Sequence, residues 1–161
     1  MIETKRLILR PFIKEDASDV FEYLNEPLVN CFACMKLNTI KETIELMDER
    51  SKDKKYTFAI VLKENNKVIG SVSLNFKEFE NTAELGYLFN SSYWNKGYAN
   101  EAVCALLKVA FDYYNVDVVI ASYIKDNQAK LEKFVKALKK GLEVCGLPTT
   151  FVNILEDTTR A

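Results

Sequence analysis

Apolar residues in the first third of the chain follow the period of a strand and then the period of a helix. Residues 6–12 alternate between apolar and polar side chains, which predicts a strand. Residues 15–25 carry apolar side chains three or four positions apart, which predicts a helix that Pro27 stops. Thr39 and Glu42 form a T-x-x-E capping box, so a second helix is expected over residues 40–50.

The rest of the chain predicts a meander of strands followed by alternating helices and strands. Residues 56–62, 68–76 and 82–89 read as three antiparallel strands, the first two joined by the polar turn 64–67. A long helix over 99–114, a buried strand over 116–123 and a helix over 129–140 follow, with Gly141 as the expected C-terminal cap. This order predicts an α+β fold of three layers, in which helices flank both faces of a mixed, mostly antiparallel central sheet.

Composition and charge narrow the class of protein. The chain has 161 residues, of which 48% are hydrophobic, and we expect a single domain over residues 1–161. A formal net charge of −1 provides no basic field for nucleic acid or for an anionic membrane. The sequence shows no signal-peptide pattern and no stretch near the roughly 20 apolar residues of a spanning helix. It therefore favours a cytoplasmic protein.

The chain contains no histidine, which removes Ser-His and Cys-His triads and histidine bases from consideration. A general base must then be a carboxylate, a lysine, a tyrosine, a thiolate or water. Cys31 and Cys34 form a C-x-x-C sequence, but without histidine or a second pair it is not expected to bind zinc. We predict no metal site, and we expect Cys104, which lies in an apolar helical stripe, to pack in the core.

The most informative segment is the turn between the strand 82–89 and the helix that follows it. Gly97, one of only five glycines in the chain, lies between the end of the predicted strand and the start of the predicted helix. A helix start leaves backbone N–H groups without partners and carries the positive end of the helix dipole, so it binds anions. Gly97 lets a phosphate approach without meeting a Cβ, and Lys96 adds a cation. The turn therefore predicts a pyrophosphate cradle, the alternative being an ordinary strand-to-helix connection.

The residues around this turn resemble the sequence signature of a known protein family. The runs Glu84–Tyr87, Tyr93–Ala99 and Glu101-Ala102 resemble the acetyl-CoA signature of the GNAT superfamily, in particular the ribosomal-protein-alanine N-acetyltransferase branch. Asn95 stands where that branch has its first glycine. The opening Thr4–Phe12 is similar to the start of the same branch, so the resemblance covers roughly Glu3 to Asn127. It implies a GNAT-like fold and transfer of an acetyl group from acetyl-CoA to a primary amine.

The resemblance also implies which residues hold the cofactor. Leu88 and Phe89 would lie along the pantetheine arm, in the gap where relatives splay this strand from the next parallel one. Asn127 matches the asparagine that follows the next strand in relatives and contacts the cofactor. The positions expected around the pyrophosphate are Asn95, Lys96, Gly97, Tyr98, Ala99 and Asn100.

A carboxylate is the expected catalytic group. An ammonium is not a nucleophile, so the acceptor amine needs a base. Glu84 matches the acidic position of the family's Glu-Leu/Ile-Gly-Tyr run and is expected to act directly or through a water; the alternative is an ion-paired glutamate on a strand face. A backbone N–H near Leu88 or Phe89 would stabilise the oxyanion. Glu101, in the first helical turn, is expected to be mainly structural.

The C-terminal part departs from the family. No tyrosine follows Tyr123, Lys130 stands where relatives have serine, and residues 147–161 match nothing in the branch. A CoA thiol should resemble a cysteine thiol, with a pKa of about 8.5, and can leave as thiolate without that tyrosine.

Two other functions stay open. One is a non-catalytic module that binds acetyl-CoA or CoA on the same fold. The other is a nucleotide binder, which ranks lower because neither G-x-x-x-x-G-K-[ST] nor G-x-G-x-x-G occurs. For the enzyme, the acceptor would be the amine of a protein N-terminus or of a small molecule, and a homodimer through the tail strands is expected only by family analogy.

Overall fold

The computed structural model describes residues 1–25, 36–52, 56–77, 81–123, 128–144, 146–147 and 152–156. Over these ranges the strands form one seven-stranded sheet in chain order. Neighbouring strands run antiparallel from β1 to β5, and β5, β6 and β7 run parallel. The predicted mixed, mostly antiparallel sheet is confirmed. The strands are β1 (Ile2–Glu3), β2 (Leu7–Arg10), β3 (Thr57–Leu62), β4 (Lys67–Phe76), β5 (Thr82–Phe89), β6 (Val118–Tyr123) and β7 (Val152–Glu156).

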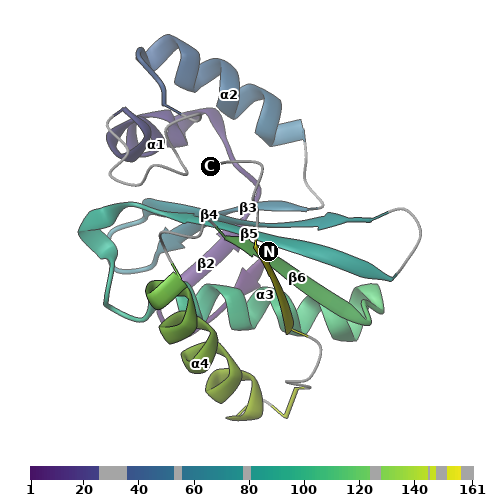
Figure 1. Cartoon of the computed structure of the whole chain (residues 1–161). Coiled ribbons are helices and arrows are strands. Elements are labelled where there is room, and N and C mark those ends of the chain that lie inside the picture. Colours follow the sequence, from purple (N-terminus) through teal and green to yellow (C-terminus); the bar gives the residue numbers. More distant parts are fainter. Residues whose placement is uncertain are drawn as a thin grey trace.

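Helices cover both faces of this sheet, as predicted (Figure 1). α1 and α2 lie over one face, and α3 and α4 lie over the other. An apolar core fills each side: Leu106 and Leu107 of α3 are fully buried on one, and Phe12 and Met47 are almost fully buried on the other. The helices are η1 (Lys14–Asp16), α1 (Ala17–Leu24), α2 (Ile40–Lys52), η3 (Ser91–Tyr93), α3 (Tyr98–Tyr114) and α4 (Gln128–Val144).

Element boundaries agree with the prediction where the local signal is strong. α2 begins directly after Thr39, whose Oγ1 accepts a hydrogen bond from Glu42 N at 3.1 Å, which is one half of the predicted capping box. The return bond differs, because Glu42 Oε2 accepts from Asn38 N at 2.9 Å, one residue before the expected donor. The first predicted helix starts instead as the short η1 turn. Arg10 holds the Asp16 carboxylate at 2.7 Å, which fixes the chain between β2 and α1.

The predicted C-terminal cap of α4 at Gly141 is wrong. α4 continues to Val144. An ideal Cβ at Gly141 would lie 2.8 Å from Cys104 Sγ, so this glycine permits close packing of α4 against α3. The helix is capped at Gly146, whose φ is +70°. Its N–H donates to Glu143 O at 3.0 Å while Leu147 N donates to Leu142 O at 2.9 Å, the two bonds of a Schellman motif.

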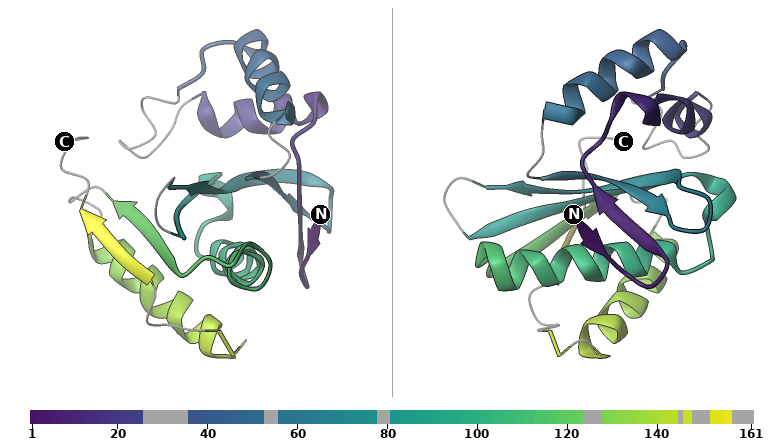
Figure 2. Two further views of the ribbon diagram at one scale, coloured as in Figure 1. Left: turned by 90° about the vertical axis from the view of Figure 1, so that its right-hand side faces the viewer. Right: turned by 180° about the vertical axis from the view of Figure 1, so that it is seen from behind.

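β5 and β6 diverge after a short parallel pairing. The pairing joins three residues at the start of β5, of which the last is Glu84 opposite Ile120. Residues Leu85–Phe89 have no partner on β6, although β5 stays paired with β4 as far as Phe89. Seen along the sheet, β6 and β7 tilt away from the other strands (Figure 2). One edge of β5 is therefore released from the sheet just before the turn that leads into α3.

Candidate functional site

The turn between η3 and α3 is built on two left-handed residues. Asn95 and Gly97 have φ angles of +60° and +79°, a conformation that asparagine and glycine adopt most readily. Asn95 can therefore stand where glycine was expected. The first hydrogen bond at the start of α3 runs from Glu101 N to Gly97 O at 3.1 Å, so the three preceding N–H groups have no partner within the helix. These groups belong to Tyr98, Ala99 and Asn100.

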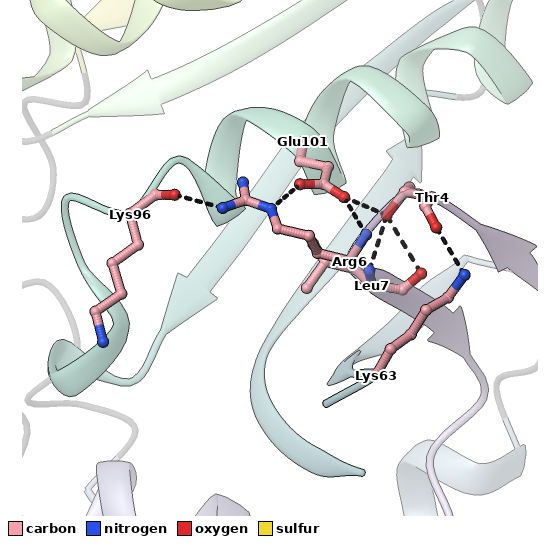
Figure 3. Close-up of polar contacts among 6 residues, drawn as sticks. All are labelled: Thr4, Arg6, Leu7, Lys63, Lys96 and Glu101. Carbon is pink, nitrogen blue, oxygen red and sulfur yellow. Dashed lines mark hydrogen bonds and ion pairs between the residues drawn. The ribbon is translucent and has the colours of Figure 1, made fainter. Parts of the chain in front are cut away.

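Arg6 and Glu101 tie this turn to the segment before β2 (Figure 3). Arg6 Nε donates to Glu101 Oε2 at 2.7 Å, and the backbone N of Arg6 donates to Oε1 at 2.8 Å. Thr4 Oγ1 also donates to Oε1, at 2.6 Å. Arg6 Nη1 reaches the carbonyl of Lys96 at 2.9 Å, and its guanidinium lies 4.4 Å from the centre of the Tyr98 ring. The N-terminal segment thus fixes the turn from outside.

Glu101 owes its protonation behaviour to these contacts. Burial raises the pKa of the Glu101 carboxyl, but the hydrogen bonds from Thr4 and Arg6 and the positive charge of Arg6 lower it further than burial raises it. The net pKa lies below the ordinary value of a glutamate. The carboxylate therefore fastens the start of α3 to the N-terminus, as expected for a mainly structural residue.

Replacing this carboxylate should make stability less dependent on pH. Because the folded-state pKa of Glu101 is depressed, its contribution is present above the ordinary carboxyl pKa and is lost as pH falls through the folded pKa. Glu101→Gln should cost about 1–3 kcal/mol at pH 7. The gap to wild type should shrink as pH falls from about 4.5, because a protonated glutamate resembles glutamine. Urea unfolding across this pH range measures the gap.

A matched control is Glu3→Gln, which removes a half-exposed carboxylate that pairs with Lys63 at 3.2 Å. This change should cost well under 1 kcal/mol at any pH. A stability gap for Glu101→Gln that stays constant down to pH 3 would show that the carboxylate charge contributes nothing.

The other side chains of the turn point in different directions. Lys96 is exposed, and its Nζ lies 5.2 Å from the centre of the Tyr93 ring. Asn100 Oδ1 accepts a long hydrogen bond from Cys104 Sγ at 3.6 Å, and the same side chain lies beside Gly141 of α4. Asn100 therefore uses its side chain in the α3–α4 contact. Only its backbone N–H belongs to the anion-binding end of the helix.

The structure separates the roles of Leu88 and Phe89. Asn90 N donates to Ile69 O at 2.8 Å, so the backbone groups of Leu88, two residues earlier, also point toward β4. Those of Phe89 point to the edge that faces away from β4, where Trp94 Nε1 donates to Phe89 O at 3.0 Å. The expectation that Leu88 N–H could stabilise an oxyanion is therefore wrong. The side chain of Leu88 packs in the core under α1 and α2.

Glu84 lies on the sheet face that α1 and α2 cover. Leu85 and Phe89 pack on the α3 side and Leu88 on the α1 side, so the alternation of β5 places Glu84 and Gly86 with Leu88. Glu84 is partly buried, and its Oε2 lies 3.2 Å from Lys77 Nζ. The ion-paired state considered as the alternative for this residue is therefore present.

Polar side chains of β4 lie beside Glu84 on the same face. Asn75 is opposite Glu84 in the register, and Ser73 is opposite Gly86, where an ideal Cβ would lie 2.7 Å from Ser73 Oγ. Ser71 is opposite Leu88. This face is thus apolar beneath α1 and becomes polar toward Glu84.

Three residues considered in the sequence analysis lie in segments that the structure does not describe. Asn127, the remaining predicted cofactor-binding residue, lies outside the described residues, and so do Cys31 and Cys34. Among the described residues, no cluster of three or more His, Cys, Asp or Glu side chains could hold a metal ion. None of the described helices is long and apolar enough to cross a membrane.

Sequence reasoning did not identify Arg6 and Thr4 as part of the site. They lie 95 and 97 positions before their partner Glu101, and no local pattern connects residues so far apart. The sequence marked Thr4 and Arg6 only through the resemblance of residues 4–12 to the same family. That resemblance does not indicate which residues they contact.

Comparison with known proteins identifies the family. A protein-family model described as an acetyltransferase (GNAT) domain matches residues 6–137. The chain belongs to the GNAT acetyltransferase family. It is 32% identical to the "Uncharacterized N-acetyltransferase YnaD" of Bacillus subtilis (strain 168), over 78% of this chain and 74% of that protein. It is 31% identical to the "Uncharacterized N-acetyltransferase p20" of Bacillus licheniformis, over 86% and 83%.

Solved structures agree with this assignment. The GNAT-family acetyltransferase from Bacillus anthracis superposes with a TM-score of 0.72 at 29% identity, covering 83% of this chain and 81% of that one. The Microcin C7 self immunity acetyltransferase MccE, solved in complex with acetyl-CoA and AMP, superposes with a TM-score of 0.66 at 18% identity, covering 84% and 78%. This GNAT chain is accordingly an acyltransferase of the N-acetyltransferase class.

Proposed function

We propose that this GNAT protein transfers the acetyl group of acetyl-CoA to a primary amine, by direct attack while both substrates are bound. The acceptor is the amine of a protein N-terminus or of a small molecule. The observation that carries the proposal is the turn at Asn95 and Gly97, which presents the free end of α3 next to the released edge of β5.

The residues of the turn fit a pyrophosphate. Gly97 has no Cβ in a left-handed position, and the N–H groups of Tyr98, Ala99 and Asn100 have no acceptor within the helix. Lys96 adds an exposed positive charge beside them. We assign the pyrophosphate to this turn and the pantetheine arm to the edge of β5 that Phe89 N–H faces. When bound, acetyl-CoA supplies the activated acetyl group.

Glu84 is our candidate for the general base. Its side chain belongs to the sheet face under α1 and α2, so an acceptor amine that reaches it approaches from that side. A strand rises about 3.3 Å per residue, which places Glu84 roughly 17 Å from Phe89. Phe89 N–H is therefore too far away to contact an acetyl group that lies beside Glu84. Phe89 suits the pantetheine arm, and Glu84 accepts the proton of the ammonium directly or through a water.

Thermal unfolding with acetyl-CoA tests the proposal first. A ligand that binds only the folded state raises the unfolding midpoint by mass action, by several degrees for about 100-fold excess over Kd. ATP at the same concentration should give no comparable shift. Release of the CoA thiol with a panel of amines, beginning with peptide N-termini, then tests transfer. Binding without release across the panel favours a non-catalytic CoA-binding module, and the absence of any shift contradicts the cradle.

A further inference from the structure

Gly86 lies in the middle of β5, although neither its backbone conformation nor its backbone packing requires a glycine. The glycines with a positive φ are Gly97 and Gly146. An ideal Cβ at Gly70 of β4 would meet the carbonyl of Leu88, but one at Gly86 would meet no backbone atom of the described residues within 4 Å, its chain neighbours apart. A glycine inside a strand weakens it and often marks a place where a ligand comes close. Gly86 therefore indicates a space that is kept open on this strand.

The hydroxyl of Ser73 enters the space above Gly86. Ser73 is directly opposite Gly86 on β4, and an ideal Cβ at Gly86 would lie 2.7 Å from Ser73 Oγ. Apart from the chain neighbours of Gly86, no other heavy atom of the described residues lies within 4 Å of that point. Ser73 is half-buried, and no hydrogen bond engages its hydroxyl in the part of the chain that the structure describes. This hydroxyl is therefore available to a ligand in the space.

Glu84 borders the same space. Glu84 and Gly86 are two residues apart on one face of β5, which separates their Cα atoms by about 6.7 Å. Ser73 Oγ lies close to where a side chain of residue 86 would begin, so the side chains of Ser73 and Glu84 are neighbours on this face. One nitrogen that donates to two oxygens at about 2.9 Å each holds them roughly 5 Å apart. The spacing along β5 therefore suits an amine nitrogen between the carboxylate and the hydroxyl.

The space also adjoins the edge of β5 that we assign to the pantetheine arm. Gly86 belongs to the part of β5 without a partner on β6, and Glu84 is the last residue that is paired there. Backbone groups alternate along a strand, so Leu85 and Tyr87 direct theirs to the same released edge as Phe89. An amine between Glu84 and the hydroxyl thus lies beside this edge, on the sheet face under α1 and α2.

A base alone does not orient the nitrogen of the acceptor. An alkyl ammonium has three N–H donors and no acceptor. When Glu84 takes one proton, a second oxygen that holds one of the remaining N–H groups fixes the direction of the lone pair. Such orientation lowers the barrier to attack on the acetyl group. A serine hydroxyl can accept this hydrogen bond and stays neutral, so it does not compete with Glu84 for the proton.

We propose that the hydroxyl of Ser73 accepts a hydrogen bond from the acceptor amine, in the space that Gly86 leaves open beside Glu84. This inference rests on the acetyltransferase function proposed above and adds a residue to its acceptor site. Glu84 removes the proton, Ser73 Oγ orients the nitrogen, and Gly86 provides the room for both.

The test uses the amine of the panel that wild type acetylates fastest and measures its kcat/KM from release of the CoA thiol. Ser73→Ala should lower this value about 10- to 100-fold, as expected for a hydrogen bond to a charged group. Gly86→Ala should lower it at least as far, because its methyl group takes the place of the hydroxyl. The double variant should be no lower than Gly86→Ala alone, since the hydroxyl has nothing to orient once the space is filled.

Two results would overturn the proposal. An unchanged kcat/KM in Ser73→Ala means that the hydroxyl does not touch the acceptor. Losses that multiply in the double variant mean that Ser73 and Gly86 act independently, so the hydroxyl does not act through this space.

Ser71→Ala is the matched control. Ser71 lies on the same face of β4 as Ser73 but is opposite Leu88, farther from Glu84, so removing its hydroxyl should leave kcat/KM unchanged. Both serine variants should keep the wild-type Kd for acetyl-CoA in isothermal titration and the wild-type midpoint of urea unfolding. A raised Kd in Ser73→Ala would mean that β5 has moved, which would assign the loss of activity to the fold and reject the proposal.

Failure of the acetyltransferase function would look different, because wild type would release no CoA thiol with any amine. Thermal unfolding of the CoA complex with each amine of the panel then tests the amine site alone. A midpoint shift that disappears in Ser73→Ala and persists in Ser71→Ala supports the site without catalysis. No shift with any amine, or a shift that both variants retain, rejects the site.

Discussion

Gly97→Val is expected to weaken acetyl-CoA binding by at least 100-fold while the chain still folds. A valine at a φ of +79° is strained by about 1–3 kcal/mol, and its side chain projects where the phosphates would approach the N-terminus of α3. The nearest heavy atom to an ideal Cβ is Arg6 Nη2 at 3.4 Å, so the fold itself meets no backbone clash. Isothermal titration with acetyl-CoA gives the change in Kd, and urea unfolding gives the change in stability.

Gly146→Val provides a matched control. Gly146 also has a left-handed φ, of +70°, and no atom lies within 4 Å of its ideal Cβ. The same backbone strain is therefore introduced beyond the end of α4, away from the turn. It should cost a similar amount of stability and leave the Kd unchanged. If Gly97→Val binds acetyl-CoA as tightly as Gly146→Val does, the phosphates do not lie at this turn.

Features of the fold that depend on neighbouring residues were predicted from the sequence, whereas a feature that depends on a distant residue was not. The bounds of β5 and the place of Gly97 at the start of α3 follow from neighbouring residues, and both were predicted. Gly141 was assigned as a cap because a glycine after an apolar helical pattern usually is one. Its actual role depends on Cys104 of a different helix, which no local pattern can indicate.

The same limit applies to the candidate site. Residues 95–100 and Glu84 could be proposed from the sequence because each lies in a short run typical of the family. Arg6 could not, because its role is created by the fold, which brings the segment before β2 beside Lys96 and Glu101. Sequence patterns thus predicted the strands and helices that carry the proposed site, but not the long-range contacts that hold these elements together.

Glu84→Gln is expected to reduce kcat by about 10²- to 10⁴-fold, the usual contribution of a general base. The affinity for acetyl-CoA should be unchanged, because Glu84 lies at the opposite end of β5 from the turn. The substitution keeps the size of the side chain and exchanges the ion pair with Lys77, at 3.2 Å, for a neutral contact. Steady-state kinetics with an identified acceptor, together with titration of acetyl-CoA, measures both quantities.

Glu101→Gln is the informative comparison, because it should show the reverse pattern. Loosening the start of α3 raises the Kd for acetyl-CoA, while kcat at saturating cofactor stays close to wild type, since no step of proton transfer uses Glu101. The two glutamates are 17 positions apart in the sequence and lie on opposite sides of the β5–α3 turn. A full kcat in Glu84→Gln would remove Glu84 as the general base and would leave the proton of the acceptor to water or to another side chain.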